Sequence, residues 1–312
     1  MDKIVLLKGG ISEEREVSLH TCSAVENAFK RLGKNFEIVD PYNFLENGKV
    51  NYNSLIKKLQ KIAPTIVFNG LHGGDGENGN IQGILTAHNI SFTGSGKKAC
   101  SIAMDKIQSK LLAKNLGIPV PDFLKYEKGD KISEDKIINS LGLPIVIKPN
   151  SSGSSVGISI VTNREEIFPA IEKAAEFDAC VLIEKFIPNR EITVAILGQS
   201  ALPVVEIIAD NGWYDYIHKY TKGKTVYESP ANIDAEQSLT VQKYAEMMFK
   251  KMDCADYARV DFRFDGKKFY FLELNTLPGM TNLSLVPMAA KAINVGFDDL
   301  IRKISEKDFK ME

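Results

Sequence analysis

Three oxygen-bearing side chains lie on two strand-like segments in the last third of the chain. Glu273 and Asn275 are two positions apart, so on one strand they leave the same face. A tight turn at Asp265-Gly266 would bring Asp261 beside them. Hard oxygen ligands of this kind suit Mg²⁺, which leaves its other positions to water and phosphate. Arg259 alternates onto the same face and suits a site that handles a phosphate or an oxyanion.

The alternative interpretation of this segment is a solvated hairpin with ordinary surface charges. Here, however, the polar residues interrupt runs of Val, Phe, Tyr and Leu, which are typical of strands that pack on a core. We therefore favour the metal site over the solvated hairpin.

The overall composition excludes several classes of function. The chain has 312 residues and a net charge of −1, so it has no general attraction to nucleic acid or to anionic membranes. No apolar run is long enough to span a bilayer, and the N-terminus resembles a strand rather than a signal peptide. The cysteines lack the spacing of a zinc or redox site, so we expect buried thiols in a reducing cytoplasm. They are Cys22, Cys100, Cys180 and Cys254.

The first hundred residues alternate short apolar runs with amphipathic stretches. This pattern predicts an α/β fold with a parallel, doubly wound, Rossmann-like sheet, whose ligands bind at the carboxyl ends of the strands. Glycines at positions 9–10 and 73–74 follow two of the strands at such ends. The expected strands are residues 4–7, 36–39, 65–68 and 91–93, and the expected helices are residues 16–32, 55–62 and 81–88.

The glycines at 94–96 mark a boundary, beyond which strands and helices continue in a different order. We expect domains at residues 1–97, 98–188 and 189–312, the last of them dominated by strands. The middle region should contain helices at 106–117 and 168–177 and strands at 144–149, 156–161 and 180–183. The last region should contain strands at 193–197 and 202–208, the Asp261 hairpin, and helices at 235–252 and the C-terminus.

A glycine-serine loop at residues 150–157 can drape backbone N–H groups over a phosphate, although a plain flexible loop explains it equally well. It lacks the Gly-Lys-Ser/Thr of a Walker loop. Lys148 ends an apolar strand just before the loop, and a partly buried ammonium group needs an anion. Lys106 is either a second phosphate ligand or a solvated helix lysine.

Residues 184–187 connect a strand to the next region. Such a connector can present backbone groups to a purine edge while its apolar side chains sandwich the ring, and a plain strand end is the alternative. Glu191 is placed to bind ribose hydroxyls. Near the N-terminus, Ser12 is expected to cap the first helix, and a carboxylate in that first turn can receive a substrate ammonium group.

These motifs occur in the order found in the ATP-grasp ligases, and the chain resembles the D-alanine:D-alanine ligase family over nearly its full length. The resemblance implies a Rossmann-like N-terminal domain followed by a two-subdomain ATP-grasp fold. The matching segments are residues 9–18, 71–79, 93–96, 104–106, 148–157, 214–220, 259–261 and 273–287.

The resemblance also implies roles for individual residues. ATP would lie between the two ATP-grasp subdomains, beside two Mg²⁺ or Mn²⁺ ions with Glu273 as the bridging ligand. The nucleotide ligands would be Lys106, Lys148, Ser154 and Ser155 at the phosphates, Glu184, Lys185, Phe186 and Ile187 at adenine, and Glu191 at the ribose, with Asp261, Glu273 and Asn275 on the metals.

The implied reaction joins two D-alanine molecules through an acyl phosphate and serves peptidoglycan precursor synthesis. Arg259 and the Gly279 N–H would stabilise developing negative charge. The first D-alanine would be bound by Glu14, which forms a hydrogen-bonded set with Ser154 and Tyr220, and the second by Ser284 and Leu285. His72 and Lys219 complete the implied substrate contacts.

Four competing interpretations are tied to sequence features. The Lys219-Tyr220 pair favours the dipeptide product over D-alanine:D-lactate or D-alanine:D-serine ligation, and His218 is treated as a solvated loop residue. A nicotinamide oxidoreductase would need Gly-x-Gly-x-x-Gly after the first strand, which is missing. A non-catalytic ATP sensor would tolerate loss of Asp261, Glu273 or Arg259, and all are present. The family further implies a homodimer without nucleic-acid or membrane partners.

Overall fold

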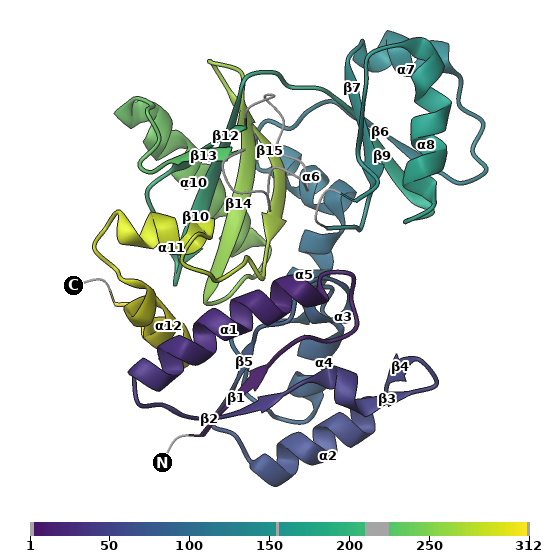
Figure 1. Ribbon diagram of the computed structural model, residues 1–312. Helices are drawn as coiled ribbons and strands as arrows, with labels where there is room; N and C mark the ends of the chain where they lie inside the picture. The colour runs from purple at the N-terminus through teal and green to yellow at the C-terminus, as the bar shows by residue number, and fades with distance from the viewer. Residues whose placement is uncertain (1–2, 154–155, 210–224, 311–312) are drawn as a thin grey trace.

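Three larger β-sheets follow one another along the described part of the chain, together with a two-stranded β3-β4 ribbon, and Figure 1 shows each larger sheet with its own helices. The computed structural model describes residues 3–153, 156–209 and 225–310. Within these ranges, no helix is both long and apolar enough to cross a bilayer.

The N-terminal sheet is parallel, with strand order β2-β1-β5, as the alternating pattern predicted. Helix α1 covers one face, and α2 and α4 cover the other. The strand expected at residues 91–93 is reduced to one bridge between Val67 and Phe92. The elements are β1 (Lys3–Leu7), α1 (Arg15–Arg31), β2 (Asn35–Val39), η1 (Pro41–Phe44), β3 (Leu45–Glu46), β4 (Lys49–Val50), α2 (Tyr52–Ile62), β5 (Ile66–Asn69), α3 (Gly74–Glu77) and α4 (Asn80–Ala87).

The expected cap of the first helix was wrong. Helix α1 begins at Arg15 with Glu14 as the N-cap residue, and the Ser12 hydroxyl instead donates to the His72 carbonyl oxygen. Arg15 turns away to pair with Asp40 at 2.7 Å. The Glu14 side chain is therefore placed by a turn in front of the helix, at the carboxyl end of the sheet.

The second sheet is antiparallel, with order β6-β9-β7-β8, and α8 packs on one of its faces. Strand β6 and helix α7 were not predicted, and β8 is shorter than expected because residues 156–157 form a turn. The elements are α5 (Lys97–Met104), α6 (Lys106–Asn115), β6 (Phe123–Glu127), α7 (Glu134–Leu141), β7 (Ile145–Pro149), β8 (Ser159–Val161), η2 (Arg164–Glu166), α8 (Ile167–Ala175) and β9 (Cys180–Lys185).

The third sheet has the order β13-β12-β10-β14-β15, with β11 paired to β10. The strand expected at 202–208 begins only at Val205, because Pro203 has no N–H to donate to a strand ladder. The elements are β10 (Arg190–Leu197), β11 (Ser200–Ala201), β12 (Val205–Ala209), β13 (Thr225–Glu228), α10 (Ala235–Lys251), β14 (Tyr257–Phe264), β15 (Phe269–Asn275), α11 (Leu285–Lys291) and α12 (Phe297–Glu306).

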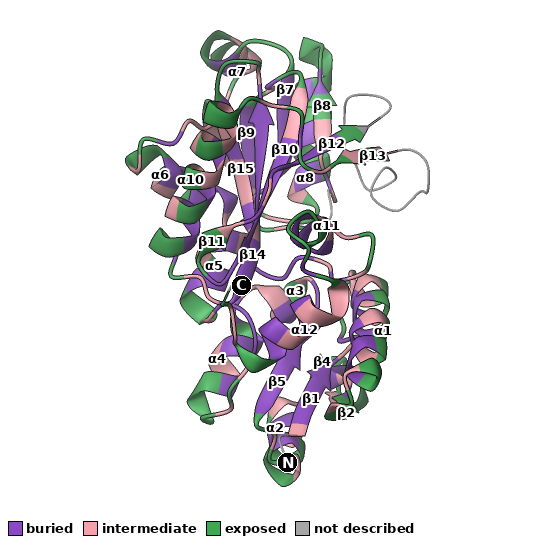
Figure 2. Cartoon of the chain, turned by 90° about the vertical axis from the view of Figure 1, so that its left-hand side faces the viewer, coloured by how far each residue is buried: buried purple, intermediate pink, exposed green. Residues whose placement is uncertain are grey.

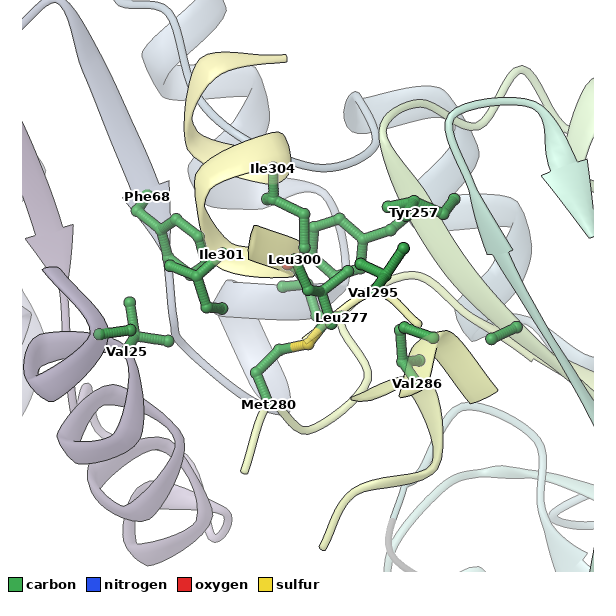
Figure 3. Close-up of a cluster of buried hydrophobic side chains, with 14 of the residues drawn as sticks. Val25, Phe68, Tyr257, Leu277, Met280, Val286, Val295, Leu300, Ile301 and Ile304 are labelled. Atoms are coloured by element: carbon green, nitrogen blue, oxygen red, sulfur yellow. The ribbon is translucent and has the colours of Figure 1, made fainter. Parts of the chain in front are cut away.

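An apolar core joins the first and third sheets. Val25 of α1 and Phe68 of β5 belong to the same buried cluster as Tyr257 of β14 and Ile301 of α12 (Figure 3). Figure 2 shows buried residues along the strands and exposed residues on the outer sides of the helices. Two thiols, Cys22 and Cys100, are buried as expected, whereas Cys180 and Cys254 are only half-buried.

Candidate active site

The predicted oxygen ligands lie together on one face of the third sheet. Asp261 of β14 stands directly opposite Glu273 of β15, and Arg259 stands opposite Asn275. The turn predicted at Asp265-Gly266 is present: the Asp265 carboxylate accepts hydrogen bonds from the N–H groups of residues 267 and 268. Directly opposed residues share a face, so all four side chains lie on the same side of the sheet.

A β-bulge makes this arrangement possible. The register shifts between Asp261 and Phe262, so that Phe262 pairs with Phe271 while Asp261 pairs with Glu273. Phe271 and Glu273 are two residues apart and would share a face of a regular strand. The extra residue, Leu272, instead lets Phe271 remain in the core while Glu273 turns to the opposite face.

The ligand set is held by charged neighbours. Arg259 donates two hydrogen bonds to Asp261, from Nε at 2.9 Å and from Nη2 at 2.8 Å. The Thr193 hydroxyl donates to the same carboxylate at 2.6 Å. Lys106 Nζ lies 3.2 Å from Glu273 Oε2 and donates to the Ser152 carbonyl oxygen at 2.7 Å. Lys106 is therefore buried at the site and is not a solvated helix lysine.

The donor set fits a hard divalent cation. Among the residues that the structure describes, no three His, Cys, Asp or Glu side chains form a metal-binding group. The candidate set consists of two carboxylates and the Asn275 amide oxygen, which accepts the Leu277 N–H at 3.0 Å. Few protein oxygens with other positions left to water and phosphate are the usual arrangement for Mg²⁺, so the residues suit this ion.

A cavity of about 1080 Å³ opens in front of these strands. It brings together segments that are far apart in the sequence, from α1, the loop after β5, β15 and the start of α11. Nine predicted site residues line it, namely Glu14, His72, Lys106, Arg259, Glu273, Asn275, Gly279, Ser284 and Leu285.

Glu14 lies where two glycine loops meet. A Cβ at Gly73 would come 3.0 Å from Glu14 Oε2, and one at Gly153 would come 3.1 Å from Glu14 Oε1. The carboxylate thus lies close against both glycines, between the His72 loop and the glycine-serine loop. The expected partners of Glu14, Ser154 and Tyr220, lie outside the described residues, as do Ser155, His218 and Lys219.

His72 and Glu77 occupy the same wall of the cavity. His72 Nε2 lies 3.0 Å from the Thr21 hydroxyl, and burial lowers the pKa of His72 to about 4, so the ring is neutral at pH 7. Burial, reinforced by the Glu14 carboxylate, raises the pKa of Glu77. Asp75 points elsewhere and bonds Tyr52 and the α3–α4 turn. Of these two acids, Glu77 alone lines the cavity.

Gly279 and Ser284 form the end of the cavity beneath α11. A Cβ at Gly279 would lie 3.3 Å from the Ser284 hydroxyl. That hydroxyl accepts the Thr281 N–H at 3.0 Å, and the Met280 N–H donates to Thr21 of α1 at 3.3 Å. The loop after β15 is therefore fixed both to itself and to the N-terminal domain.

Lys148, the lysine predicted to bind a nucleotide phosphate, already pairs with a carboxylate of the protein. Lys148 is buried as expected, but its ammonium group lies 2.5 Å from Glu184, so the need for an anion does not by itself require a phosphate. The argument that led to Lys148 was therefore incomplete. Glu184 is 2% exposed and faces Lys148 from the neighbouring strand β9.

The connector at residues 184–187 is held by an arginine that sequence reasoning missed. The N–H groups of Lys185 and Phe186 donate to the carbonyl oxygens of residues 122 and 144, so they are already used. Arg263 donates to the Ile187 carbonyl oxygen at 3.1 Å, lies 3.2 Å from Glu191, and packs over the Phe186 ring. Because Arg263 continues the alternation of Arg259 and Asp261, its position on this face was predictable.

Comparison with known proteins identifies the family of the chain. The family model described as the D-ala D-ala ligase C-terminus matches residues 112–306. A D-alanine–D-alanine ligase of Haemophilus ducreyi is 40% identical over 98% of this chain and 97% of its own length. One of Methylacidiphilum infernorum is 42% identical over 97% and 94%.

Solved structures give the same result for the fold. The ATP complex of the D-alanine–D-alanine ligase of Bacillus anthracis has a TM-score of 0.82 at 30% identity, covering 98% of this chain and 96% of that one. The VanG D-Ala:D-Ser ligase of Enterococcus faecalis has a TM-score of 0.80 at 29% identity, covering 98% of both. The predicted fold, a Rossmann-like domain followed by an ATP-grasp fold, is confirmed, and the chain belongs to the D-alanine–D-alanine ligase family.

Proposed function

We propose that this chain joins two D-alanine molecules to D-alanyl-D-alanine with the conversion of ATP to ADP and phosphate. The observation that carries the proposal is the shared cavity. The wall formed by Glu273, Asn275 and Arg259 faces the same space as Glu14 and Ser284, which suit the two ends of small amino acids. A site for a nucleotide phosphate and a site for amino-acid groups are thus contiguous.

We assign the divalent cations to Asp261, Glu273 and Asn275. Mg²⁺ bound there supplies positive charge at the transferring phosphoryl group. The paired positions of Asp261 and Glu273 across β14 and β15 support this assignment.

The nucleotide is assigned to the region between the second and third sheets. Lys106 of α6 and Lys148 of β7 are assigned to its phosphates. The 184–187 connector is assigned to adenine, with the Ile187 N–H as its donor, since the two preceding N–H groups are already bonded. Glu191, held by Arg263, is assigned to the ribose hydroxyls. Ser154 and Ser155 remain assigned to the phosphates from sequence.

The amino-acid substrates are assigned to the cavity. Glu14 binds the ammonium group of the first D-alanine, whose carboxylate attacks the γ-phosphate of ATP and forms an acyl phosphate. Arg259 and the Gly279 N–H stabilise the charge that develops on oxygen when the second amine attacks the acyl carbon and phosphate leaves. Ser284 and Leu285, at the start of α11, bind the carboxylate of the second D-alanine.

Other assigned roles complete the reaction. His72, Lys219 and Tyr220 are assigned to substrate contacts, and Tyr220 with Ser154 to a hydrogen-bonded set with Glu14. Closure over the cavity excludes water, which would otherwise hydrolyse the acyl phosphate.

The test is an ATP-dependent phosphate-release assay with D-alanine, D-lactate and D-serine across pH, with mass spectrometry of the products. We expect D-alanyl-D-alanine as the main product and no release with L-alanine. Depsipeptide formation with D-lactate at neutral pH would favour the lactate ligase instead. No release with any D-amino acid, despite ATP binding, would favour a nucleotide sensor.

The remaining assignments follow from the family. Domains at residues 1–97, 98–188 and 189–312, a homodimer and a cytoplasmic location are proposed from the sequence resemblance. Light scattering on the purified protein measures the mass and tests the dimer directly.

A further inference from the structure

A second lysine lies behind the nucleotide lysine, fully buried on helix α6. Lys110 has no exposed surface, and its ammonium group lies 2.9 Å from Glu184 Oε2. The same group donates to the Phe271 carbonyl oxygen at 3.2 Å. Since Glu184 belongs to the second sheet and Phe271 to the third, Lys110 contacts both sides of the proposed nucleotide cleft, and Figure 1 shows α6 between the two sheets.

Lys110, Glu184 and Lys148 form one buried chain of charges. Glu184 binds Lys110 through Oε2 and Lys148 through Oε1. Burial lowers the pKa of Lys110 to about 8. Burial alone would raise the pKa of Glu184, but the two lysines lower it overall. The cluster therefore sets two lysine side chains against a single carboxylate.

We propose that Lys110 is a positioning residue that keeps the charge of Lys148 available to the ATP phosphates by engaging the other oxygen of Glu184. This inference rests on the proposed function, in which Lys148 binds a phosphate. Lys110 itself has no exposed surface from which to touch ATP, so its effect on the nucleotide passes through Glu184 and Lys148.

The reason is electrostatic. Without Lys110, Glu184 and Lys148 would form an isolated buried ion pair with no net charge. A phosphate would then compete for the Lys148 ammonium group with a carboxylate that has no other cationic partner. With Lys110 present, Glu184 is shared between two cations and a net positive charge remains at the cleft. A single buried carboxylate thus orients Lys148 without cancelling its charge.

The experiment compares Lys110→Met, Lys110→Met/Glu184→Gln and the control Lys114→Met. Methionine fills the lysine's buried space without charge, and Glu184 keeps Lys148 as its partner. Lys114 is exposed one turn further along α6. ATP binding is measured by calorimetry, adenosine binding by saturation-transfer NMR, and folding by the thermal midpoint.

We expect Lys110→Met to weaken ATP binding about tenfold or more while adenosine binding changes less than about twofold. Because Glu184 also belongs to the adenine connector, the double variant is judged by its ratio of ATP to adenosine affinity. This ratio should recover most of its wild-type value, because the neutral amide that replaces the Glu184 carboxylate does not cancel the charge of Lys148. Lys114→Met should bind ATP as the wild type does. Should Lys110→Met fail to fold, the double variant, which has no carboxylate at position 184, still tests the proposal by a near wild-type ratio of ATP to adenosine affinity.

Three results would overturn the positioning role: unchanged ATP affinity in Lys110→Met, an equal loss of ATP and adenosine binding, or a double variant no better than the single one. The last two are what a merely structural role predicts. If the wild-type protein itself failed to bind ATP, the proposed function would be contradicted, and the phosphate partner of Lys148 with it.

Discussion

The nucleotide side and the amino-acid side of the site are built on opposite electrostatic plans. On the nucleotide side, Lys148 and Lys106 are each paired with a carboxylate of the protein, at 2.5 Å to Glu184 and 3.2 Å to Glu273. On the amino-acid side, Glu14 and Glu77 line the same cavity, and the pKa of Glu77 is raised by burial and by the charge of Glu14.

The difference follows from the substrates that each side is proposed to bind. A triphosphate is negatively charged and binds to cationic side chains. Carboxylates of the protein hold these cations in position before the triphosphate binds. An amino acid brings a compact ammonium group. Neighbouring carboxylates repel one another, so they are stabilised most when that positive charge binds. The two sides should therefore respond differently to charge-removing substitutions and to pH.

The largest effect is expected from Glu273→Gln, where the two sides meet. The amide removes one of two carboxylates from the proposed metal set and also releases Lys106. We expect phosphate release with D-alanine to fall by about 10³-fold or more, because bound metal supplies several kcal/mol of transition-state stabilisation. Glu172→Gln, on the exposed side of α8, is the matched control. Wild-type turnover in Glu273→Gln would remove the metal assignment.

Local sequence patterns predicted much of the fold and the metal wall. Alternation placed Glu273 beside Asn275, and the Asp-Gly turn placed Asp261 opposite, because both rules act over a few residues. The bulge at Leu272 was not predicted, since it depends on how Phe271 fits a core built by distant helices. The correct expectation for Glu273 thus depended on a feature that the pattern does not contain.

Long-range pairings account for the other errors. Lys148 was expected to need a phosphate, but Glu184, on a strand brought alongside by the fold, supplies the anion. No sequence pattern indicated that Lys110 is buried, because a lysine in an amphipathic helix is usually solvated. Ser12 has the residue type of a helix cap, yet its hydroxyl donates a hydrogen bond to the carbonyl oxygen of His72, sixty residues away.

The next largest effect is expected in stability at acid pH, on the amino-acid side. The folded-state pKa of His72 is about 4, below the ordinary value of 6.5, so the unfolded chain takes up this proton first. Stability from this group is full above pH 6.5 and is lost as pH falls toward 4, by about 3 kcal/mol in total. Denaturant unfolding at several pH values measures this loss.

His72→Gln should flatten that dependence while keeping a hydrogen-bonding group near Thr21. The control His88→Gln changes an exposed residue after α4 and should retain the wild-type slope. An identical slope in His72→Gln and the wild type would show that the acid sensitivity arises elsewhere.

On the nucleotide side, Lys148→Ala should weaken ATP binding by about 30-fold, the value of one charge-assisted hydrogen bond. Lys110 still neutralises Glu184 in this variant, so the fold should persist. Calorimetry with ATP measures the change, and Lys173→Ala, exposed on α8, is the control. D-alanine binding should be unaffected, and an equal loss of both ligands would mean that the two sides are not separate.

The smallest effect is expected from Glu14→Gln on the amino-acid side. The amide keeps the shape that fits between Gly73 and Gly153, but it loses the charge that attracts the ammonium group. The KM for the first D-alanine should rise about tenfold, with ATP affinity unchanged, because one ion pair of this kind contributes roughly 1.5 kcal/mol. Glu13→Gln, exposed at the adjacent position, is the closest control. A rise in the KM for ATP instead of D-alanine would place Glu14 on the nucleotide side and would erase the contrast between the two halves of the site.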